Sequence, residues 1–417
     1  MATESAFDVD LSRAGEMRNG LLSEIGKLRE IERVHWSPAS HCWLVSQHQD
    51  IVEGFSGRLP LSNYKLDKSS FGELSAEEAR RRLPNLTRYV QSWITESDPP
   101  NHTRLRKLLS KAFGKSVVEG VRPFARARVA YLMDKIRESP EIEFNEGVAR
   151  QLPGVVILKL LGLPDELYGH LKEWATSFTV ALASALPKTE WLDRAERSMV
   201  EMNEIFRDQI AKRRRQPGGE NDLLSVMLSA RDESDALSEE ELLGVLQLII
   251  VAGHDTTSNS MALGTATLAR HPEAWRHMRE HPQGTAQAVL EIMRYSAMSA
   301  AMPRAVSEDF VWHGRQLKKG EIVFLMIAAG NRDPRAFAEP EKLDLSRSND
   351  NSLTFGPGLH HCIGHLLAKM QLNEYFGALV QRFDGATVLD QDLNFLPQLV
   401  FRGVSSLNIR FQPRAEN

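Results

Sequence analysis

A thiol, two histidines and three glycines lie close together in the segment LTFGPGLHHCIGHLLAKMQ, which runs from Leu353 to Gln371. Apolar residues at three-and-four spacing follow Cys362, so a helix is predicted to begin next to the thiol. A helix N-terminus stabilises a thiolate, because its dipole and its free N–H groups favour negative charge. Glycines let the backbone turn sharply and approach a flat, bulky group. The segment therefore predicts a thiolate held in a glycine-rich loop for a chemical purpose.

These residues leave four uses of the cysteine open. A nucleophile needs an orienting base, which His360 or His361 could provide. A zinc ion needs three or four ligands, and Cys42 is the only other cysteine in the chain. A haem iron needs one axial thiolate. A buried cysteine without chemistry is the fourth alternative.

A second candidate site lies inside an apolar helix predicted over residues 238–270, which begins with a capping box at Ser238. About 33 residues at roughly 1.5 Å each make this helix long enough to cross the molecule. The segment AGHDTTS interrupts it with Gly253, Asp255 and Thr256. These residues either bend the helix with a polar side facing solvent, or form a groove where a carboxylate and a hydroxyl relay protons to a small ligand.

Helical periodicity dominates the remaining sequence. Further helices are predicted near residues 104–113, 118–138, 164–184, 190–215, 284–296 and 363–382. Short strands are predicted near residues 42–46, 310–317, 321–327 and 405–411. Residues 56–97 are expected to form a loop-rich insertion over a site. No linker divides the chain, so we expect a single domain over residues 1–417.

Composition excludes several classes of protein. The 417 residues carry 51 Lys and Arg against 55 Asp and Glu, a net charge of −4 that argues against a nucleic-acid partner. The longest apolar stretch, residues 242–253, is too short to span a bilayer and contains Gln247, and the N-terminus has no leader pattern. Two cysteines cannot form a disulfide framework, so a reducing cytoplasm is the expected location.

The cysteine loop also matches a specific ten-residue pattern, F-G-x-G-x-H-x-C-x-G, through Phe355, Gly356, Gly358, His360, Cys362 and Gly364. This pattern resembles the haem-ligand signature of the cytochrome P450 superfamily, the haem-thiolate monooxygenases, and other family features recur in order along the chain. The resemblance implies a mainly α fold with a small β-rich lobe. It also implies haem b as the cofactor, bound between the long helix and the helix after Cys362, with this cysteine as the iron ligand and Phe355 beside the haem.

The resemblance extends to a buried ion-pair cluster. The segment EIMR places Glu291 and Arg294 on one helix face, which by itself is compatible with a surface ion pair. In the family such a pair is buried with a third arginine, and the stretch FAEPEKLDLSR points to Arg347. Leu343 departs from the family pattern, where an aromatic residue is usual. Breaking a buried cluster of this kind is expected to be severe.

Four residues match positions that hold haem propionates in the family: His102, Arg106, Arg304 and His360. Arginine suits this task because its planar fork binds a carboxylate with two hydrogen bonds. A solvated basic helix is the alternative for the segment that carries the first two. It remains the expectation for the neighbouring Arg104, Lys107 and Lys111. His361 fills a free position of the pattern and is expected to be incidental.

The resemblance implies that O2 is activated and that a hydrophobic small molecule is hydroxylated or epoxidised. Gly253 would make room in the oxygen-binding groove, and Asp255 and Thr256 would form its acid–alcohol pair. The chain has no flavin or nicotinamide fingerprint. A ferredoxin or flavodoxin with its reductase is therefore expected to supply electrons, docking on the basic face near Arg104, Lys107 and Lys111. Alternatives are a peroxygenase, an isomerase or dehydratase of the same fold, and a haem-thiolate sensor.

Substrate size is suggested by the small side chains of AMSAAM, residues 297–302. They lie in a region that the family places above the haem, together with residues 56–97, residues 175–192, the first half of the long helix and residues 399–402. A terpenoid, a steroid or a macrolide-like polyketide is the hypothesis. Arg402 is expected to face solvent, with a substrate carboxylate as the alternative partner.

Overall fold

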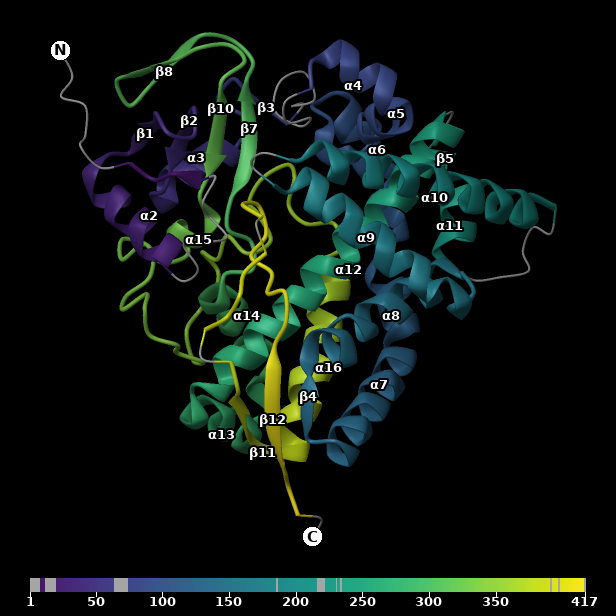
Figure 1. Cartoon of the computed structure of the whole chain (residues 1–417), viewed down its shortest axis with the longest axis vertical. Coiled ribbons are helices and arrows are strands. Elements are labelled where there is room, and N and C mark those ends of the chain that lie inside the picture. The colour runs from purple at the N-terminus through teal and green to yellow at the C-terminus, as the bar shows by residue number, and fades with distance from the viewer. Residues whose placement is uncertain are drawn as a thin grey trace.

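The fold is taken from a computed structural model. It describes residues 8–11, 20–63, 74–184, 187–215, 222–229, 231–232, 235–390, 392–396 and 398–415. Helices form most of the molecule, and the long helix α12 (Glu239–Ala269) runs diagonally through its centre (Figure 1). The mainly α architecture with small sheets agrees with the prediction.

The seven helices predicted from apolar periodicity are all present, with ends shifted by a few residues. They are α6 (Asn101–Ala112), α7 (Lys115–Glu138), α9 (Tyr168–Leu182), α10 (Thr189–Arg215), α12, α14 (Thr285–Ser296) and α16 (His365–Arg382). Ser238 caps α12 by accepting a hydrogen bond from the N–H of Glu241, whose side chain returns to the backbone of Ser238. The predicted capping box is therefore confirmed.

Several helices are shorter or less amphipathic and were not predicted. They are α2 (Gly20–Ile31), α3 (His48–Phe55), α4 (Ala76–Arg82), α5 (Pro84–Val90), α8 (Gln151–Leu161), α11 (Leu223–Ser229), α13 (Pro272–Glu280) and α15 (Ile327–Gly330). The prediction of an irregular insertion over residues 56–97 is wrong for α4 and α5. Two turns of helix give too few apolar repeats to be recognised, and residues 64–73 of this stretch lie outside the described part.

The main sheet joins distant parts of the chain in the order β1-β2-β10-β7-β3. Its strands are β1 (Val34–Ser37), β2 (Cys42–Val45), β10 (Ile322–Leu325), β7 (Met302–Val306) and β3 (Leu61–Ser62). β2 and β10 are parallel, whereas the other neighbours are antiparallel. The sheet places α3 and the N-terminal strands beside the segment that carries Arg304.

The strand predicted over residues 310–317 is instead a hairpin of β8 (Phe310–Trp312) and β9 (Arg315–Leu317). His313 and Gly314 form its turn, both with positive φ. A second sheet pairs β11 (Phe383–Val388) with β12 (Asn408–Pro413) and β12 with β4 (Glu141–Glu143). Among the described helices, none has the length and hydrophobicity needed to span a membrane.

Candidate active site around Cys362

The loop before α16 is a tight turn that packs against α3. The N–H of Cys362 donates to the carbonyl of Phe355 at 2.8 Å. Gly358 has a φ of +78°, and a Cβ atom there would lie 2.5 Å from the backbone oxygen of Phe55. Glycine is therefore required at this position for its backbone angle and for the close approach to α3. The loop holds the cysteine next to α3 and to α16.

The electrostatics of the thiol differ from the sequence prediction. Burial raises the pKa of Cys362, although the N–H of Gly364 and the positive charges of Arg106 and Lys369 act in the opposite direction. α16 begins at His365, so the thiol lies before its first turn and gains less from the helix terminus than expected. A bound metal cation would reverse this balance, because a coordinating thiol is deprotonated.

Hydrogen-bond donors gather beside this loop. His102 in α6 is only 2% exposed, and neither of its ring nitrogens has a hydrogen-bond partner. Its ring centroid lies 4.0 Å from that of His360 in the cysteine loop. The Nε2 atom of His360 contacts Nδ2 of Asn63 at 2.9 Å, and Asn63 in turn donates to Asp98. A fully buried imidazole without partners points to a polar group that binds there.

Two arginines complete this group of donors. Arg304 in β7 is 5% exposed, lies over the ring of Phe55 at 4.8 Å, and donates to the carbonyl of Pro303. Burial lowers the pKa of Arg304 to about 10 and also lowers the pKa of Arg106. Neither arginine forms an ion pair with a carboxylate in the described ranges. A buried cation such as Arg304 needs a counter-charge, and the partly exposed Arg106 can share one; the carboxylates of haem propionates fit that need.

The polar residues of the AGHDTTS segment lie on two different faces of α12. Ala252 is exposed although it lies in the middle of the molecule, and the partly exposed Thr256 donates its hydroxyl hydrogen bond to the carbonyl of Ala252. Asp255, in contrast, is 7% exposed and lies against the neighbouring helices. The structure therefore places the hydroxyl, and not the carboxylate, at the open face of the helix.

His254 holds the carboxylate of Asp255. Its Nδ1 lies 2.7 Å from an oxygen of Asp255, and its Nε2 lies 3.1 Å from the carbonyl of Arg150. Burial acts to raise the pKa of Asp255, but the bond to His254 and the positive charge of Arg150 outweigh it, so this pKa is lowered. The sequence prediction did not include His254, although it stands within the AGHDTT motif.

Gly253 packs closely against α8 on one side. A Cβ atom at this position would lie 3.0 Å from Cδ1 of Ile157 in α8. A side chain at Gly253 would therefore press on α8, and a role of this glycine in an oxygen-binding groove stays a prediction. The exposed part of this stretch of α12 consists of Ala252 and the partly exposed Gly253 and Thr256.

The predicted ion-pair cluster is present on α14. Glu291 and Arg294 are fully buried and share two hydrogen bonds of 2.7 and 2.8 Å. Nε of Arg347 donates to Glu291 at 3.2 Å, and Arg294 also donates to the carbonyls of Asn331 and Pro340. The cluster thus fastens α14 to the loop that precedes the cysteine segment. Leu343, the departure from the family pattern, packs on the edge of the main core.

Two expectations about the substrate side are changed. Arg402 is 6% exposed and donates to the carbonyl of Ser296 at 2.9 Å, so the prediction that it faces solvent is wrong. Ala300 and Ala301 are almost completely buried, because they pack between the main sheet and the segment near Leu399. Their small side chains therefore permit close packing and leave no open space of their own.

The predicted docking face is partly occupied by an ion pair. Arg104 contacts Glu241 in the first turn of α12. Lys107 is exposed, and the side chain of Lys111 lies outside the described residues. Lys369, which was not predicted, lies over the ring of Phe355 at 5.0 Å on the side of the cysteine loop.

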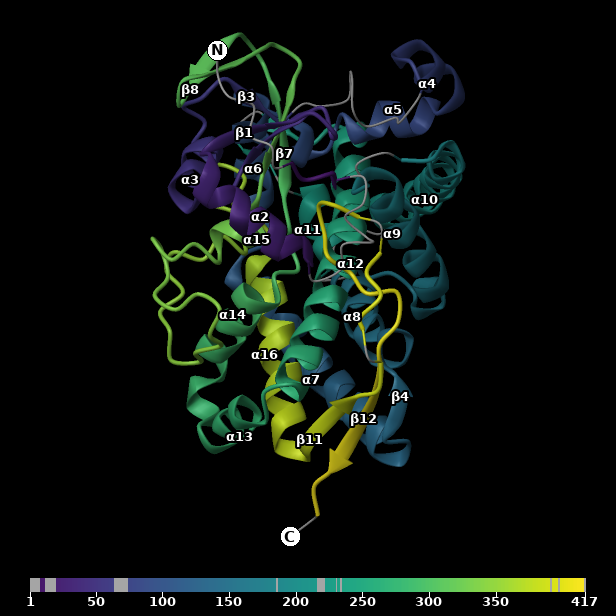
Figure 2. The same cartoon turned by 60° about the vertical axis from the view of Figure 1, so that its left-hand side comes forward.

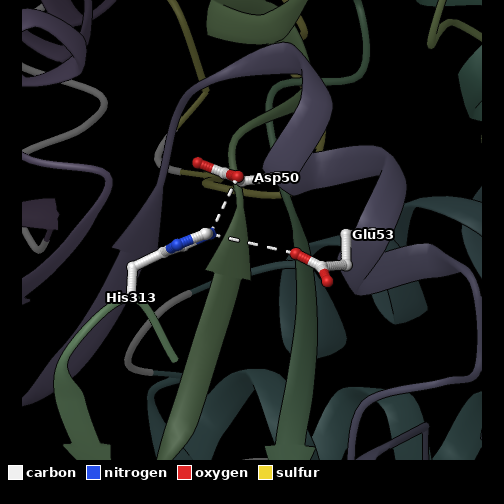
Figure 3. Close-up of side chains that lie close together, drawn as sticks. All are labelled: Asp50, Glu53 and His313. Carbon is white, nitrogen blue, oxygen red and sulfur yellow. Dashed lines mark hydrogen bonds and ion pairs between the residues drawn. The ribbon is translucent and has the colours of Figure 1, made fainter. Parts of the chain in front are cut away.

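A separate group of possible metal ligands lies at the β8–β9 hairpin (Figure 3). Nε2 of His313 lies 3.0 Å from Asp50 and 3.8 Å from Glu53, both in α3. Arg33 already contacts both carboxylate oxygens of Asp50, and Trp312 donates to Glu53. These contacts fasten the hairpin to α3, so we interpret the group as an ion-pair cluster.

Comparisons with known proteins agree with this geometry. The family model described as Cytochrome P450 matches residues 169–406. Cytochrome P450 CYP107DY1 of Priestia megaterium is 33% identical over 75% of this chain and 75% of its own length. The polyketide biosynthesis cytochrome P450 PksS of Bacillus subtilis is 28% identical over 94% of this chain and 96% of its own.

A solved structure gives the same result for the fold. Epothilone D-bound cytochrome P450epoK superimposes with a TM-score of 0.88 at 26% identity, over 98% of this chain and all of that one. The family model covers more than half of the sequence, and the first relative exceeds 30% identity over three quarters of it. The chain therefore belongs to the cytochrome P450 family of haem b-dependent monooxygenases.

Proposed function

We propose that Cys362 would bind the haem iron and that His102, Arg106, Arg304 and His360 would hold the haem propionates. The observation that carries this proposal is the group of buried donors beside the cysteine loop. Both ring nitrogens of His102 are unpaired, and the buried Arg304 has no ion-pair partner among the described side chains. Two carboxylates at this position would satisfy these groups together.

When bound, the haem supplies the activation of O2 and the transfer of one oxygen atom to a substrate C–H or C=C bond. The thiolate of Cys362 would donate electron density to the iron. The N–H of Gly364, which already interacts with the thiol, would stabilise the sulfur as an anion. Phe355 lies at the start of this loop and accepts the hydrogen bond from Cys362, so it would fix the loop beside the haem.

Thr256 and Asp255 of α12 are proposed to have different roles in proton transfer. The hydroxyl of Thr256 lies at the open face and donates to the carbonyl of Ala252, so its oxygen is left to accept a hydrogen bond from a water molecule. Asp255 is ionised, because His254 and Arg150 stabilise its charged form. We propose that it passes protons from the side of α8 and α9 toward Thr256. Gly253 would contribute through the packing of α12 on α8.

Electrons must come from another protein, and we propose a ferredoxin or flavodoxin with its reductase. Lys107 and Lys369 are exposed or partly exposed near α6 and the cysteine loop and could attract an acidic partner. Both cysteines are free of disulfides, which supports a cytoplasmic location. The sheets join the first and last thirds of the chain, which supports a single domain over residues 1–417.

The substrate is proposed to be an apolar polyketide, terpenoid or steroid. The similarity to a P450 of polyketide biosynthesis and to one bound to epothilone D supports a bulky molecule. Binding can be measured as a change in the haem absorption spectrum across a panel of such compounds. Responses to small aromatic compounds alone would contradict this substrate class.

Replacement of Thr256 by Ala tests the proton role. With a surrogate ferredoxin and reductase, we expect the fraction of electrons that ends in product to fall about tenfold or more, with hydrogen peroxide formed instead. Thr257→Ala is the matched control, because Thr257 is buried beside Thr256 on the other face of α12. Equal coupling in the Thr256 variant and the control would refute the role of this hydroxyl.

A further inference from the structure

A cavity of about 730 Å³ is lined by residues of α2 and α14, among others. These two helices lie on the same side of the molecule (Figure 2). The cavity is bounded by α2, the C-terminal part of α12, the end of α14 and, nearer the C-terminus, by Leu393, Phe395 and Arg402. Small-molecule sites commonly have volumes of about 300–1,000 Å³. The cavity is therefore large enough for an organic ligand.

The polypeptide separates this cavity from the haem site. The α12 residues that line it begin at Leu263, about two turns after Thr256. Between them the C-terminal segment crosses the helix so closely that a Cβ atom on Gly403 would lie 2.8 Å from Nδ2 of Asn259. A molecule in the cavity would consequently contact different residues from a substrate beside Thr256.

The described lining is strongly basic. It contains two acidic residues, Glu30 and Glu341, and five basic residues, Lys27, Arg29, Arg270, Arg332 and Arg402. Glu30 also pairs with Arg335, which is not among these lining residues. The cavity therefore has an excess of positive charge.

The positive charges are deepest at Arg402 and Arg332. Burial lowers the pKa of Arg402 to about 10, and the positive charge of Arg332 lowers it further. Arg332 is partly exposed, pairs with the exposed Glu341 and donates to the carbonyl of Tyr295, yet its positive charge still acts unfavourably on the buried Arg402. A bound anion would stabilise both arginines.

Unpaired polar groups point to a ligand independently of the charge. Oγ of Ser296 is buried and has no hydrogen-bond partner, and its residue is only 7% exposed. Nε of Arg332 is also buried without a partner. Both residues line the cavity. One acceptor placed between them would satisfy two donors that otherwise cost free energy.

Much of the remaining cavity lining is apolar, and there is free space beside it. Leucine, alanine and phenylalanine side chains line it, namely Leu22, Leu263, Ala266, Leu393 and Phe395. Gly26 stands in the middle of α2, where glycine costs about 1 kcal/mol of helix stability, yet a Cβ atom there would meet nothing within 4 Å. The cavity therefore has room for an apolar body beside α2.

We propose that this cavity is a second ligand site for a small amphiphile with one anionic group, separate from the haem site. The anionic group lies between Arg402, Arg332 and Ser296, and the apolar body lies against α2 and Leu263. Arg402 also holds the carbonyls of Ser296 and Ala297, and its N–H donates to Met298. The ligand thus contacts residues next to the segment 296–298, which precedes β7 and Arg304, on the side turned away from the proposed haem site.

The test uses the holoenzyme saturated with phenylimidazole, so that the haem site is filled. Anilinonaphthalene sulfonate is then titrated and its fluorescence measured, and N-phenylnaphthylamine serves as the uncharged probe of similar shape. Gly26→Phe fills the cavity, whereas Gly26→Ala is the matched control. Arg270→Gln removes a positive charge from the rim, where Arg270 has no ion pair with the described residues.

We expect one sulfonate probe to bind per chain in the presence of phenylimidazole. Gly26→Phe should weaken it by about tenfold or more, and Gly26→Ala by less than about twofold. Arg270→Gln should weaken the sulfonate by about two- to fivefold and leave the uncharged probe unchanged. Equal affinity of the two Gly26 variants, or complete displacement of the sulfonate by phenylimidazole, would overturn the proposal. Haem content verifies that each variant is folded, and no turnover is needed.

Discussion

Replacement of Arg304 by Met is predicted to have opposite effects on the apoprotein and the holoprotein. Arg304 is buried, and the pKa of about 10 reports an unfavourable environment for its charge. At about 1.4 kcal/mol per pH unit, the penalty is about 3 kcal/mol relative to an ordinary arginine. The cation–π contact with Phe55 and the hydrogen bond to the carbonyl of Pro303 stabilise the charged side chain by about 1 kcal/mol each. The apoprotein should therefore gain about 1 kcal/mol from the substitution.

In the holoprotein the same substitution is predicted to remove the proposed charge-assisted hydrogen bond between Arg304 and a haem propionate, worth about 1.5–3 kcal/mol. Haem should then leave about 10- to 100-fold faster, which can be measured as transfer to apomyoglobin. Urea unfolding of the apoprotein gives the other half of the comparison. Arg126→Met is the control, since Arg126 is exposed and pairs with Glu374.

The reasoning would be refuted by a loss of apoprotein stability together with an unchanged rate of haem release. That result would mean that the protein itself stabilises the charge of Arg304. A gain in the apoprotein with faster haem release would support propionate binding at this residue.

Two further predictions concern buried charges. Glu291→Gln leaves the buried Arg294 without its counter-charge, so the free energy of unfolding measured in urea should fall by about 3–5 kcal/mol. The exposed Glu119→Gln is the control, and a fall below about 1 kcal/mol in both variants would contradict the prediction. Asp255 has a lowered pKa, so its charge stabilises the fold fully above the unfolded-state pKa of about 4, and this contribution is lost progressively as the pH falls from there through the lower pKa of the folded state. Asp255→Asn should therefore cost about 1–3 kcal/mol at neutral pH and much less below pH of about 4; an unchanged difference across this range would exclude the ionised carboxylate as the cause.

Strong periodicity and specific motifs made much of the fold predictable. The long helix has both a capping box and a long apolar pattern on each side of the AGHDTTS segment, so its ends were predicted within one residue. The short helices α4 and α5 were missed, because two turns give little periodic signal. The strand predicted over 310–317 is a hairpin, because the turn at His313 and Gly314 was not recognised.

The candidate site was predictable where the chemistry depends on motif residues. The sequence analysis brought Cys362 together with His102 and Arg304, and these residues do gather beside one loop. It could not reveal that His254 binds Asp255, or that Arg402 is buried, because both depend on tertiary contacts. The contact between Gly253 and Ile157 could not be predicted either, because the sequence does not show which side chain packs against a glycine.

The proposed chemistry depends on the thiolate of Cys362 as the ligand of the haem iron. This ligation can be measured in the absorption spectrum of the reduced, CO-bound holoenzyme. A strongly red-shifted Soret band is expected, retained in Cys42→Ser and lost in Cys362→His. An unshifted band in the unmodified protein, or a red-shifted band that persists in Cys362→His, would contradict it.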